Sequence, residues 1–254
     1  MRLQGKTAVV TGASRNIGRA IAQTFAREGA DLAICAYERL IDLETLADDC
    51  RQDGVRVVPL LADLADPGGP GRLIAEAIEA LGRVDVLVNT VAIRPHIPFV
   101  ETTDEVWRQV MTTNLDATFR LCKAAVPGML ERGSGSIIAF GGLVSLTGVT
   151  EAAANSAAKT GVLGLIRALA AELGPHGVRA NILVPGNVDT ERENLEWYQG
   201  MTEPIGSPAN LDRIPLRRMG RVGEIAAACL FLASDESSYV TGNQIVCNGG
   251  SFIP

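Results

Sequence analysis

Short apolar stretches alternate with longer helical ones along the chain, and this alternation constrains the fold more than any other feature. The apolar stretches are near-continuously hydrophobic, as strands covered on both faces of a sheet must be. They are KTAVVTG (6–12), ADLAICA (30–36), VRVVPLLAD (55–63), VDVLVN (84–89), SIIAF (136–140), VRANILVPG (178–186) and NQIVCNGG (243–250). The helical segments between them include Ile17–Glu28, Leu73–Leu81, Thr113–Arg132, Ala152–Leu173 and Val222–Ser234.

Strands that alternate with helices over the whole length predict an α/β fold. We expect one domain over residues 1–254, built on a doubly wound parallel sheet of about seven strands with helices on both faces. Gly29 and Gly133 each follow a helical segment, where a left-handed cap is needed. The stretch Thr190–Leu216 has weak periodicity and mixes Pro, Gly, Asn and Glu. Long irregular segments in compact domains are usually functional, so we interpret it as a lid loop.

Composition and charge exclude several classes of function. Apolar residues make up 47% of the chain and charged residues 20%, which is typical of a globular protein. The net charge of −6, without a Lys/Arg cluster, argues against a nucleic-acid partner. No stretch resembles a secretory leader or a membrane span, so we expect a cytoplasmic protein. The cysteines are odd in number and lack metal-ligand spacing, which predicts free thiols and no metal site; they are Cys35, Cys50, Cys122, Cys229 and Cys247.

A glycine-containing turn joins the first strand to the first helix. In VVTGASRNIGRAIAQTFAREGA, Gly12 allows a tight turn and Gly18 allows the helix to pack close to the sheet. Backbone amides at the start of such a helix can hold a pyrophosphate. Turn glycines are common, so a turn without a ligand is the alternative. The position of this turn in a doubly wound domain favours the phosphate site.

The same turn, TGASRNIG (11–18), resembles the TGxxxGxG fingerprint of the short-chain dehydrogenase/reductases, with Asn16 in the place of the middle glycine. The resemblance extends over the full length of the chain. It includes LQGKTAVVTG (3–12), ADL (62–64), VDVLVN (84–89), TNL (113–115), PGNVDT (185–190) and PLRRMGRVGEIAAACLFLASDESSYVTGNQIVCNGG (215–250). It implies a single-domain Rossmann fold and an NAD(P)-dependent oxidoreductase that interconverts a carbonyl and an alcohol. It also implies a homo-oligomer, often a tetramer.

The end of the second strand bears on the choice of cofactor. NAD-preferring sites place an acid there for the ribose hydroxyls, whereas this strand ends at Ala36. Ser14 and Arg15 lie in the glycine turn, a combination similar to that of NADP-binding members of the family. A guanidinium matches a 2′-phosphate, so we expect NADP. Glu38 keeps NAD possible, because its carboxylate would repel the phosphate if it pointed inward.

Further cofactor contacts are implied by the resemblance alone. Asp63 would hold the adenine amino group, although it could instead only cap the loop after its strand. The expected cofactor-binding residues are Gly12, Ser14, Arg15, Asn16, Ile17, Gly18, Arg39, Asp63, Leu64, Asn89, Lys159, Pro185, Gly186, Val188 and Thr190.

The catalytic residues are where this chain departs from the family. The family uses a Ser, a Tyr-x-x-x-Lys run and an Asn on a neighbouring helix. Here NSAAK (155–159) keeps Lys159 but places Asn155 at the tyrosine position. Gly142 stands thirteen residues upstream, where the serine belongs, and Asn114 matches the supporting asparagine. The expected catalytic positions are therefore Asn114, Gly142, Asn155 and Lys159.

Asn155 changes the chemistry that the site can perform. A carboxamide has no proton to transfer at any working pH and can only donate or accept a hydrogen bond. A positioned acid contributes about 10²–10⁴ in rate, so the family's usual reaction should be severely impaired. Surrogate groups lie nearby, but Glu151 is typical of a helix N-terminus and the two histidines are typical of loops. These groups are Arg94, His96, Ser145, Thr147, Thr150, Glu151 and His176.

Three functions fit the retained turn and the altered catalytic positions. The chain could be an oxidoreductase with persistent or redirected chemistry on an unknown carbonyl or alcohol. It could be a silent subunit that assembles with an active paralogue, which the joint loss of Ser and Tyr favours. It could also be a binding protein that senses the nucleotide. In each case we expect an oligomer built through the helices at Thr113–Arg132 and Ala152–Leu173.

Overall fold

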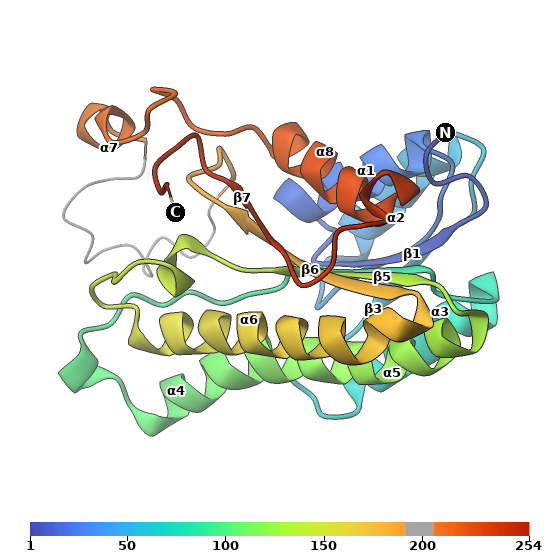
Figure 1. Cartoon of the computed structure of the whole chain (residues 1–254), viewed down its shortest axis with the longest axis horizontal. Helices are drawn as coiled ribbons and strands as arrows, with labels where there is room; N and C mark the ends of the chain where they lie inside the picture. Colours follow the sequence, from blue (N-terminus) through green and yellow to red (C-terminus); the bar gives the residue numbers. More distant parts are fainter. Residues whose placement is uncertain (192–205, 254) are drawn as a thin grey trace.

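The computed structural model describes residues 1–191 and 206–253. Its centre is one parallel sheet in the order β3-β2-β1-β4-β5-β6-β7 (Figure 1). The seven strands are those that the apolar stretches predict, so the doubly wound α/β fold is confirmed. The strands are β1 Thr7–Thr11, β2 Asp31–Ala36, β3 Val57–Leu61, β4 Val86–Asn89, β5 Gly135–Phe140, β6 Val178–Pro185 and β7 Gln244–Cys247.

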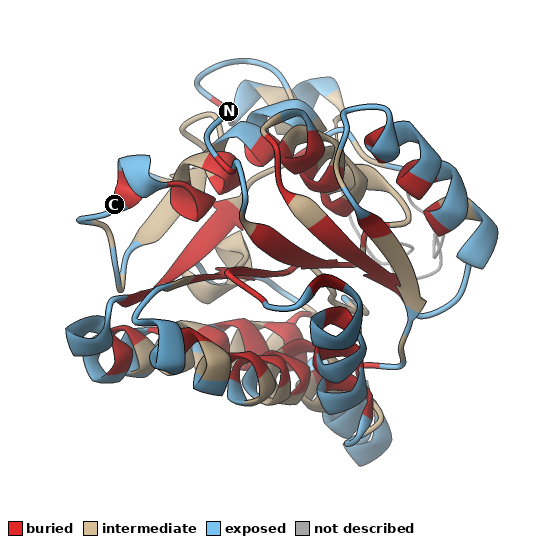
Figure 2. Cartoon of the chain, turned by 90° about the vertical axis from the view of Figure 1, so that its right-hand side faces the viewer, coloured by how far each residue is buried: buried red, intermediate tan, exposed pale blue. Residues whose placement is uncertain are grey.

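Helices cover both faces of the sheet. α1 packs against α2 and α8 on one face, and α3 packs against α5 on the other, beside α6 (Figure 1). On the helices that cover the sheet, the buried residues lie toward the sheet and the exposed residues face away from it (Figure 2). The α-helices are α1 Asn16–Arg27, α2 Leu40–Arg51, α3 Gly69–Leu81, α4 Asp104–Met111, α5 Ala117–Arg132, α6 Ala153–Leu173, α7 Pro208–Asp212 and α8 Val222–Ala233. Short 3-10 turns are Phe99–Glu101, Leu143–Ser145, Gly174–His176 and Asp235–Ser237.

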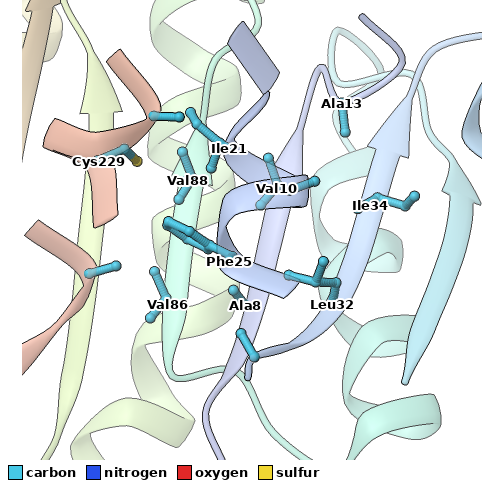
Figure 3. Close-up of a cluster of buried hydrophobic side chains, with 14 of the residues drawn as sticks. Ala8, Val10, Ala13, Ile21, Phe25, Leu32, Ile34, Val86, Val88 and Cys229 are labelled. Carbon is cyan, nitrogen blue, oxygen red and sulfur yellow. The ribbon is translucent and has the colours of Figure 1, made fainter. Parts of the chain in front are cut away.

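The hydrophobic core lies between the sheet and each helical layer. In the layer around α1, Ile21 and Phe25 are fully buried and lie over β1 and β4 (Figure 3). Cys229 of α8 closes this cluster from the side. The opposite layer is centred on Leu87 of β4 and Leu121 of α5, both buried. These two cores fix the ends of the strands, where a ligand site is expected.

Helix boundaries differ from the sequence expectations at one functional place. The segment predicted as one helix over Thr113–Arg132 begins with a π-helical turn, Thr112–Asp116, and α5 follows from Ala117. α4, the π turn and α5 are continuous in sequence. Gly133 ends α5 with a φ of 64°, which confirms its predicted left-handed cap.

The stretch predicted as a lid lies partly outside the described residues, at positions 192–205. Within the described part, α7 begins after Ser207, whose side chain accepts a hydrogen bond from the Asn210 amide. The lid therefore stays a prediction. Among residues 1–191 and 206–253, no helix is both long and apolar enough to span a bilayer.

Candidate functional site

The candidate site lies at the carboxyl ends of the central strands. β1 pairs with β2 on one side and β4 on the other, so the chain order reverses between them. Ligands of doubly wound sheets bind at this kind of switch point. Thr11 ends β1, Asn89 ends β4 and Phe140 ends β5, and the residues that follow each strand surround the site.

The turn after β1 is shaped by glycines that no other residue could replace without displacement. Gly12 has a φ of 66°, and a Cβ there would lie 2.5 Å from the Thr90 hydroxyl oxygen. A Cβ on Gly18 would overlap the carbonyl oxygen of Gly12. The Thr90 hydroxyl is fixed in turn by donating to the Thr11 carbonyl at 2.8 Å. The start of α1 therefore lies close against the strand end, as a phosphate-binding turn requires.

Asn16 begins α1 with a left-handed backbone, at a φ of 52°. Asparagine is one of the few residues other than glycine that adopt this conformation readily. Its carboxamide makes two hydrogen bonds with the main chain of Glu191, which follows β6. The sequence prediction placed Asn16 near the cofactor without foreseeing this partner.

The end of β2 lacks a carboxylate, as the sequence indicates. Ala36 is buried there, and Tyr37, Glu38 and Arg39 after it are exposed. Arg39 has a φ of 71°, and its guanidinium pairs with Asp42 Oδ2 at 2.9 Å. Binding of a phosphate by Arg39 would therefore compete with this exposed ion pair.

Asp63 and Asn89, two further predicted cofactor residues, also have partners in the protein. Asp63 Oδ1 accepts a hydrogen bond from the Ala65 amide at 2.8 Å, which is the loop cap considered as its alternative role. Asn89 is buried; its oxygen accepts from the Thr11 hydroxyl at 2.7 Å, and its amide donates to the Thr118 hydroxyl at 2.9 Å. Asn89 thus joins β1, β4 and α5 at the floor of the site.

The remaining predicted residues lie around the same strand ends. Leu64 is buried after β3, and Ser14, Arg15 and Ile17 lie in the turn or at the start of α1. After β6, the Gly186 amide donates to the Cys247 carbonyl. The segment from Pro185 to Thr190 continues from there, and Val188 bridges to Gly220.

Asn114 and Asn155 form a buried amide pair. The Asn114 amide donates to Asn155 Oδ1 at 3.2 Å and to the Ile93 carbonyl at 2.8 Å. The Asn114 oxygen accepts from the Ile93 amide at 2.9 Å, so its orientation is fixed by the chain after β4. The π turn that carries Asn114 places it against α6; such turns frequently occur at functional sites. The structure thus brings together the two asparagines that the sequence assigned to the site.

Lys159 lies one turn after Asn155 on α6 and is also buried. Its Nζ donates to the Phe140 carbonyl at 2.7 Å. Burial, helped by the positive charge of Arg94, lowers the pKa of Lys159 to about 7. The amine can therefore exchange a proton near neutral pH, unlike an exposed lysine.

Gly142, at the position of the missing serine, is in open space. Its backbone is extended, and a Cβ there would lie no closer than 3.5 Å to any atom, the nearest being Val144 Cγ2. Gly141 differs, because a Cβ there would lie 2.8 Å from Val184 Cγ2. The nearby Ser145 hydroxyl donates to the Gly142 carbonyl at 2.8 Å. No hydroxyl therefore stands at residue 142 itself.

His96 and Glu151 lie close enough to interact electrostatically. Burial lowers the pKa of His96, the Glu151 carboxylate opposes this shift, and Arg94 adds to it. Glu151 is held by its main chain, whose carbonyl accepts from the Ile97 amide at 2.9 Å. The other histidine, His176, is exposed in a 3-10 turn.

Sequence reasoning missed the groups that hold the catalytic positions in place. Thr118, the Ile93 main chain and the Phe140 carbonyl all bind predicted site residues. One signal was present, because Thr118 lies four residues after Asn114 and its hydroxyl donates to the Asn114 carbonyl. Main-chain partners leave no pattern in a sequence.

No group of three or more His, Cys, Asp or Glu side chains is arranged to hold an ion within residues 1–191 and 206–253. The cysteines are all free, as predicted, and burial raises their thiol pKa values. Four of them, Cys35, Cys50, Cys122 and Cys229, are buried in the hydrophobic core.

Comparisons with known proteins show the family to which this chain is related. A sequence profile described as enoyl-(acyl carrier protein) reductase matches residues 12–251. L-rhamnose 1-dehydrogenase (NAD(P)(+)) of Azotobacter vinelandii is 36% identical over 100% of this chain and 99% of its own. The 3-oxoacyl-(acyl-carrier-protein) reductase FabG of Escherichia coli K12 is 34% identical, with 100% of both chains covered.

A solved structure gives the same result for the fold. The crystal structure of a candidate short-chain alcohol dehydrogenase from Sinorhizobium meliloti 1021 is 33% identical, with a TM-score of 0.89, and the match covers 98% of this chain and 97% of that one. The chain therefore belongs to the short-chain dehydrogenase/reductase family of oxidoreductases. Members of this family generally use NAD or NADP as the cofactor.

Proposed function

We propose that this protein binds NADP(H) at the turn between β1 and α1 but lacks the proton transfer on which carbonyl reduction in its family depends. The observation that carries the proposal is the Asn114–Asn155 pair. Asn155 is buried at the position of the family's acid, and its oxygen is occupied by the Asn114 amide at 3.2 Å. The Asn155 amide nitrogen keeps its two N–H groups as hydrogen-bond donors.

The residues present fit a dinucleotide. Gly12 and Gly18 carry no side chain where the strand end and α1 approach each other, and such a close approach suits a pyrophosphate. When bound, the nicotinamide would supply a hydride. Asn155 could orient and polarise a carbonyl oxygen, which is worth about 10²–10³ in rate for a well-placed donor. It cannot deliver the proton that completes an alcohol.

Lys159, one helical turn after Asn155, carries a group that can move a proton. Its pKa of about 7 leaves part of the population protonated at neutral pH. Its Nζ is directed to the Phe140 carbonyl, however, and not to Asn155 in the present geometry. We infer that Lys159 holds the end of β5 and supports slow turnover at most.

The preference for NADP is supported by charge at the ribose end. Ala36 offers no carboxylate for the ribose hydroxyls, and Arg15 belongs to the turn itself. A guanidinium near the 2′-position favours a phosphate. Glu38 and Arg39 lie exposed beyond the strand, so neither is fixed against the ribose.

The experiment measures binding and turnover separately. We expect NADPH to quench the fluorescence of Trp107 and Trp197 on titration, while oxidation of NADPH with a panel of small ketones stays at background. Binding without turnover would agree with the proposal. Robust turnover would show that a surrogate acid exists, with His96 the first residue to replace. Absence of binding to NADPH and NADH would refute the cofactor role.

A silent subunit of a larger assembly is the second candidate. The observation that favours it is an exposed apolar surface on the helices beyond the site: Phe119 on α5 is 47% exposed and Trp107 on α4 is 39% exposed. A groove lined by residues of α4 and the π turn lies beside Trp107. Light scattering decides whether the chain self-associates, and co-purification from its own host identifies any active relative. A monomer at micromolar concentration would count against this candidate.

A further inference from the structure

Asn16 connects two segments that are distant in sequence. Its Nδ2 donates to the Glu191 carbonyl at 3.0 Å, and its Oδ1 accepts from the Glu191 amide at 3.0 Å. The Asn16 carboxamide thus pairs with the main-chain N–H and C=O of Glu191 in the way that two strands pair in a β-sheet. The pair therefore fixes the direction of the chain at Glu191 as well as its distance from α1.

The chain before Glu191 is also held from its other side. The Asp189 amide donates to the Gly220 carbonyl at 2.8 Å, and the Gly220 amide donates to the Asn187 carbonyl at 2.9 Å. Residues 187–191 thus run between two anchors, Gly220 on one side and Asn16 on the other. Of these two anchors, only Asn16 also belongs to the phosphate-binding turn.

We propose that Asn16 is a positioning residue that links residues 187–191 to the phosphate-binding turn and slows release of the dinucleotide. The inference rests on the proposed cofactor role of that turn. A pyrophosphate at the start of α1 would lie beside the Asn16–Glu191 pair, since Asn16 is the first residue of the helix. Departure of the cofactor past this edge would require both hydrogen bonds to open.

The side chain explains why asparagine occupies this position. Glycine would satisfy the left-handed backbone at lower steric cost, as the family fingerprint indicates at the same place. Asparagine keeps that conformation and adds a carboxamide with one donor and one acceptor group directed at Glu191. The link is therefore a property of this chain that the backbone shape alone does not require.

The test compares release of NADPH from the wild type and from Asn16→Gly. Glycine keeps the left-handed backbone and removes only the carboxamide. We expect release to become about fivefold faster, since two partly exposed hydrogen bonds contribute modestly. Stopped-flow displacement of bound NADPH, followed by nicotinamide fluorescence, gives the rate. The increase should be equal for NADH, because the link lies at the pyrophosphate, which both cofactors share.

Two further measurements separate this role from general loosening. Glu191→Ala removes the side chain but keeps both main-chain partners of Asn16, so release should stay at the wild-type rate. Hydrogen exchange of the Glu191 amide should be faster in Asn16→Gly, while the melting temperature without cofactor stays near that of the wild type.

The outcomes distinguish this inference from the proposed function. Unchanged release from Asn16→Gly, in a protein that binds NADPH, overturns the inference and leaves the proposed function intact. Unchanged exchange of the Glu191 amide overturns it as well. If the wild type binds neither NADPH nor NADH, both the proposed function and this inference are refuted.

Discussion

The turn between β1 and α1, proposed to bind phosphate, and the predicted catalytic positions lie at the same edge of the sheet, but different forces hold them. In the turn, Gly12 and Gly18 are enforced by contacts with neighbouring atoms that leave no room for a side chain. At the catalytic positions, Gly142 has free space around it and an extended backbone. The turn requires glycine because of packing, whereas no neighbouring atom requires glycine at residue 142.

This difference explains how one region can keep the family pattern while the other loses it. A larger residue in the turn would displace β1, α1 or Thr90, and stability would suffer along with binding. Replacing a serine by glycine at residue 142, or a tyrosine by asparagine at residue 155, changes chemistry without displacing an element. Asn155 even gains a buried partner in Asn114. Catalytic residues can thus be exchanged on an unchanged scaffold.

The largest effect is expected from Gly18→Ala. Its Cβ would overlap the Gly12 carbonyl, so α1 must move away from the strand. We expect a loss of about 3 kcal/mol or more in the free energy of unfolding, and no measurable NADPH binding. Urea denaturation and fluorescence titration measure the two losses. Gly142→Ala is the matched control, because its Cβ meets only Val144 at 3.5 Å and should leave both unchanged.

The next largest effect is a gain of ketone-reducing activity from substitutions at residues 142 and 155. Gly142→Ser with Asn155→Tyr should raise reduction of small ketones by about 10²–10⁴ over the wild type, because it restores a hydroxyl and a transferable proton. Asn155→Tyr alone should recover more than Gly142→Ser alone. Initial rates of NADPH oxidation for all four proteins provide the test. A double variant that binds NADPH but stays inactive would show that the pocket differs elsewhere.

A smaller effect concerns the buried amine. The Lys159 pKa is about 7 in the folded chain against 10.5 for an unperturbed lysine, so the unfolded chain binds more protons between these values. The cost in folding free energy of burying the Lys159 amine is complete below pH 7 and decreases as the pH rises toward 10.5. Relative to Lys159→Met, the wild type should therefore gain stability across this window.

Urea denaturation of both proteins from about pH 6 to about pH 10 tests this difference. Other groups, including the buried thiols, contribute equally to the two proteins and cancel. Lys159→Met also leaves the Phe140 carbonyl without its donor. This loss shifts the free energy of unfolding of the variant by the same amount at every pH, so it does not change the slope of stability against pH. Parallel curves would show that Lys159 keeps an ordinary pKa.

The smallest effect is the choice between cofactors. We expect NADPH to bind about tenfold more tightly than NADH, since Arg15 can meet a 2′-phosphate with a charge-assisted contact. Fluorescence titration of Arg15→Ala should abolish most of this preference while retaining NADH binding. Equal affinities in the wild type, or a preference for NADH, would indicate that Glu38 and not Arg15 faces the ribose.

The fold was more accessible to sequence reasoning than the site. Seven apolar stretches gave the seven strands because a buried parallel strand needs a continuous hydrophobic run. The glycine turn was readable because its constraint is steric. The partners of Asn114 and Lys159 could not be predicted, because they are main-chain groups of Ile93 and Phe140. Every residue carries such groups, so the sequence does not single them out. The link between Asn16 and Glu191 spans 175 positions and leaves no local pattern.

The π turn at Thr112–Asp116 has a consequence for the continuous rod formed by α4 and α5. A π turn holds one residue more than regular α-helical winding, and one residue corresponds to about 100° of rotation around the axis. The two halves of the rod are therefore out of phase with each other. Deleting one residue from the turn would bring the halves back into phase, rotating Trp107 and the rest of α4 relative to α5. A single added residue in the π turn thus determines both which side chains of α4 face outward and how the Asn114 amide faces Asn155.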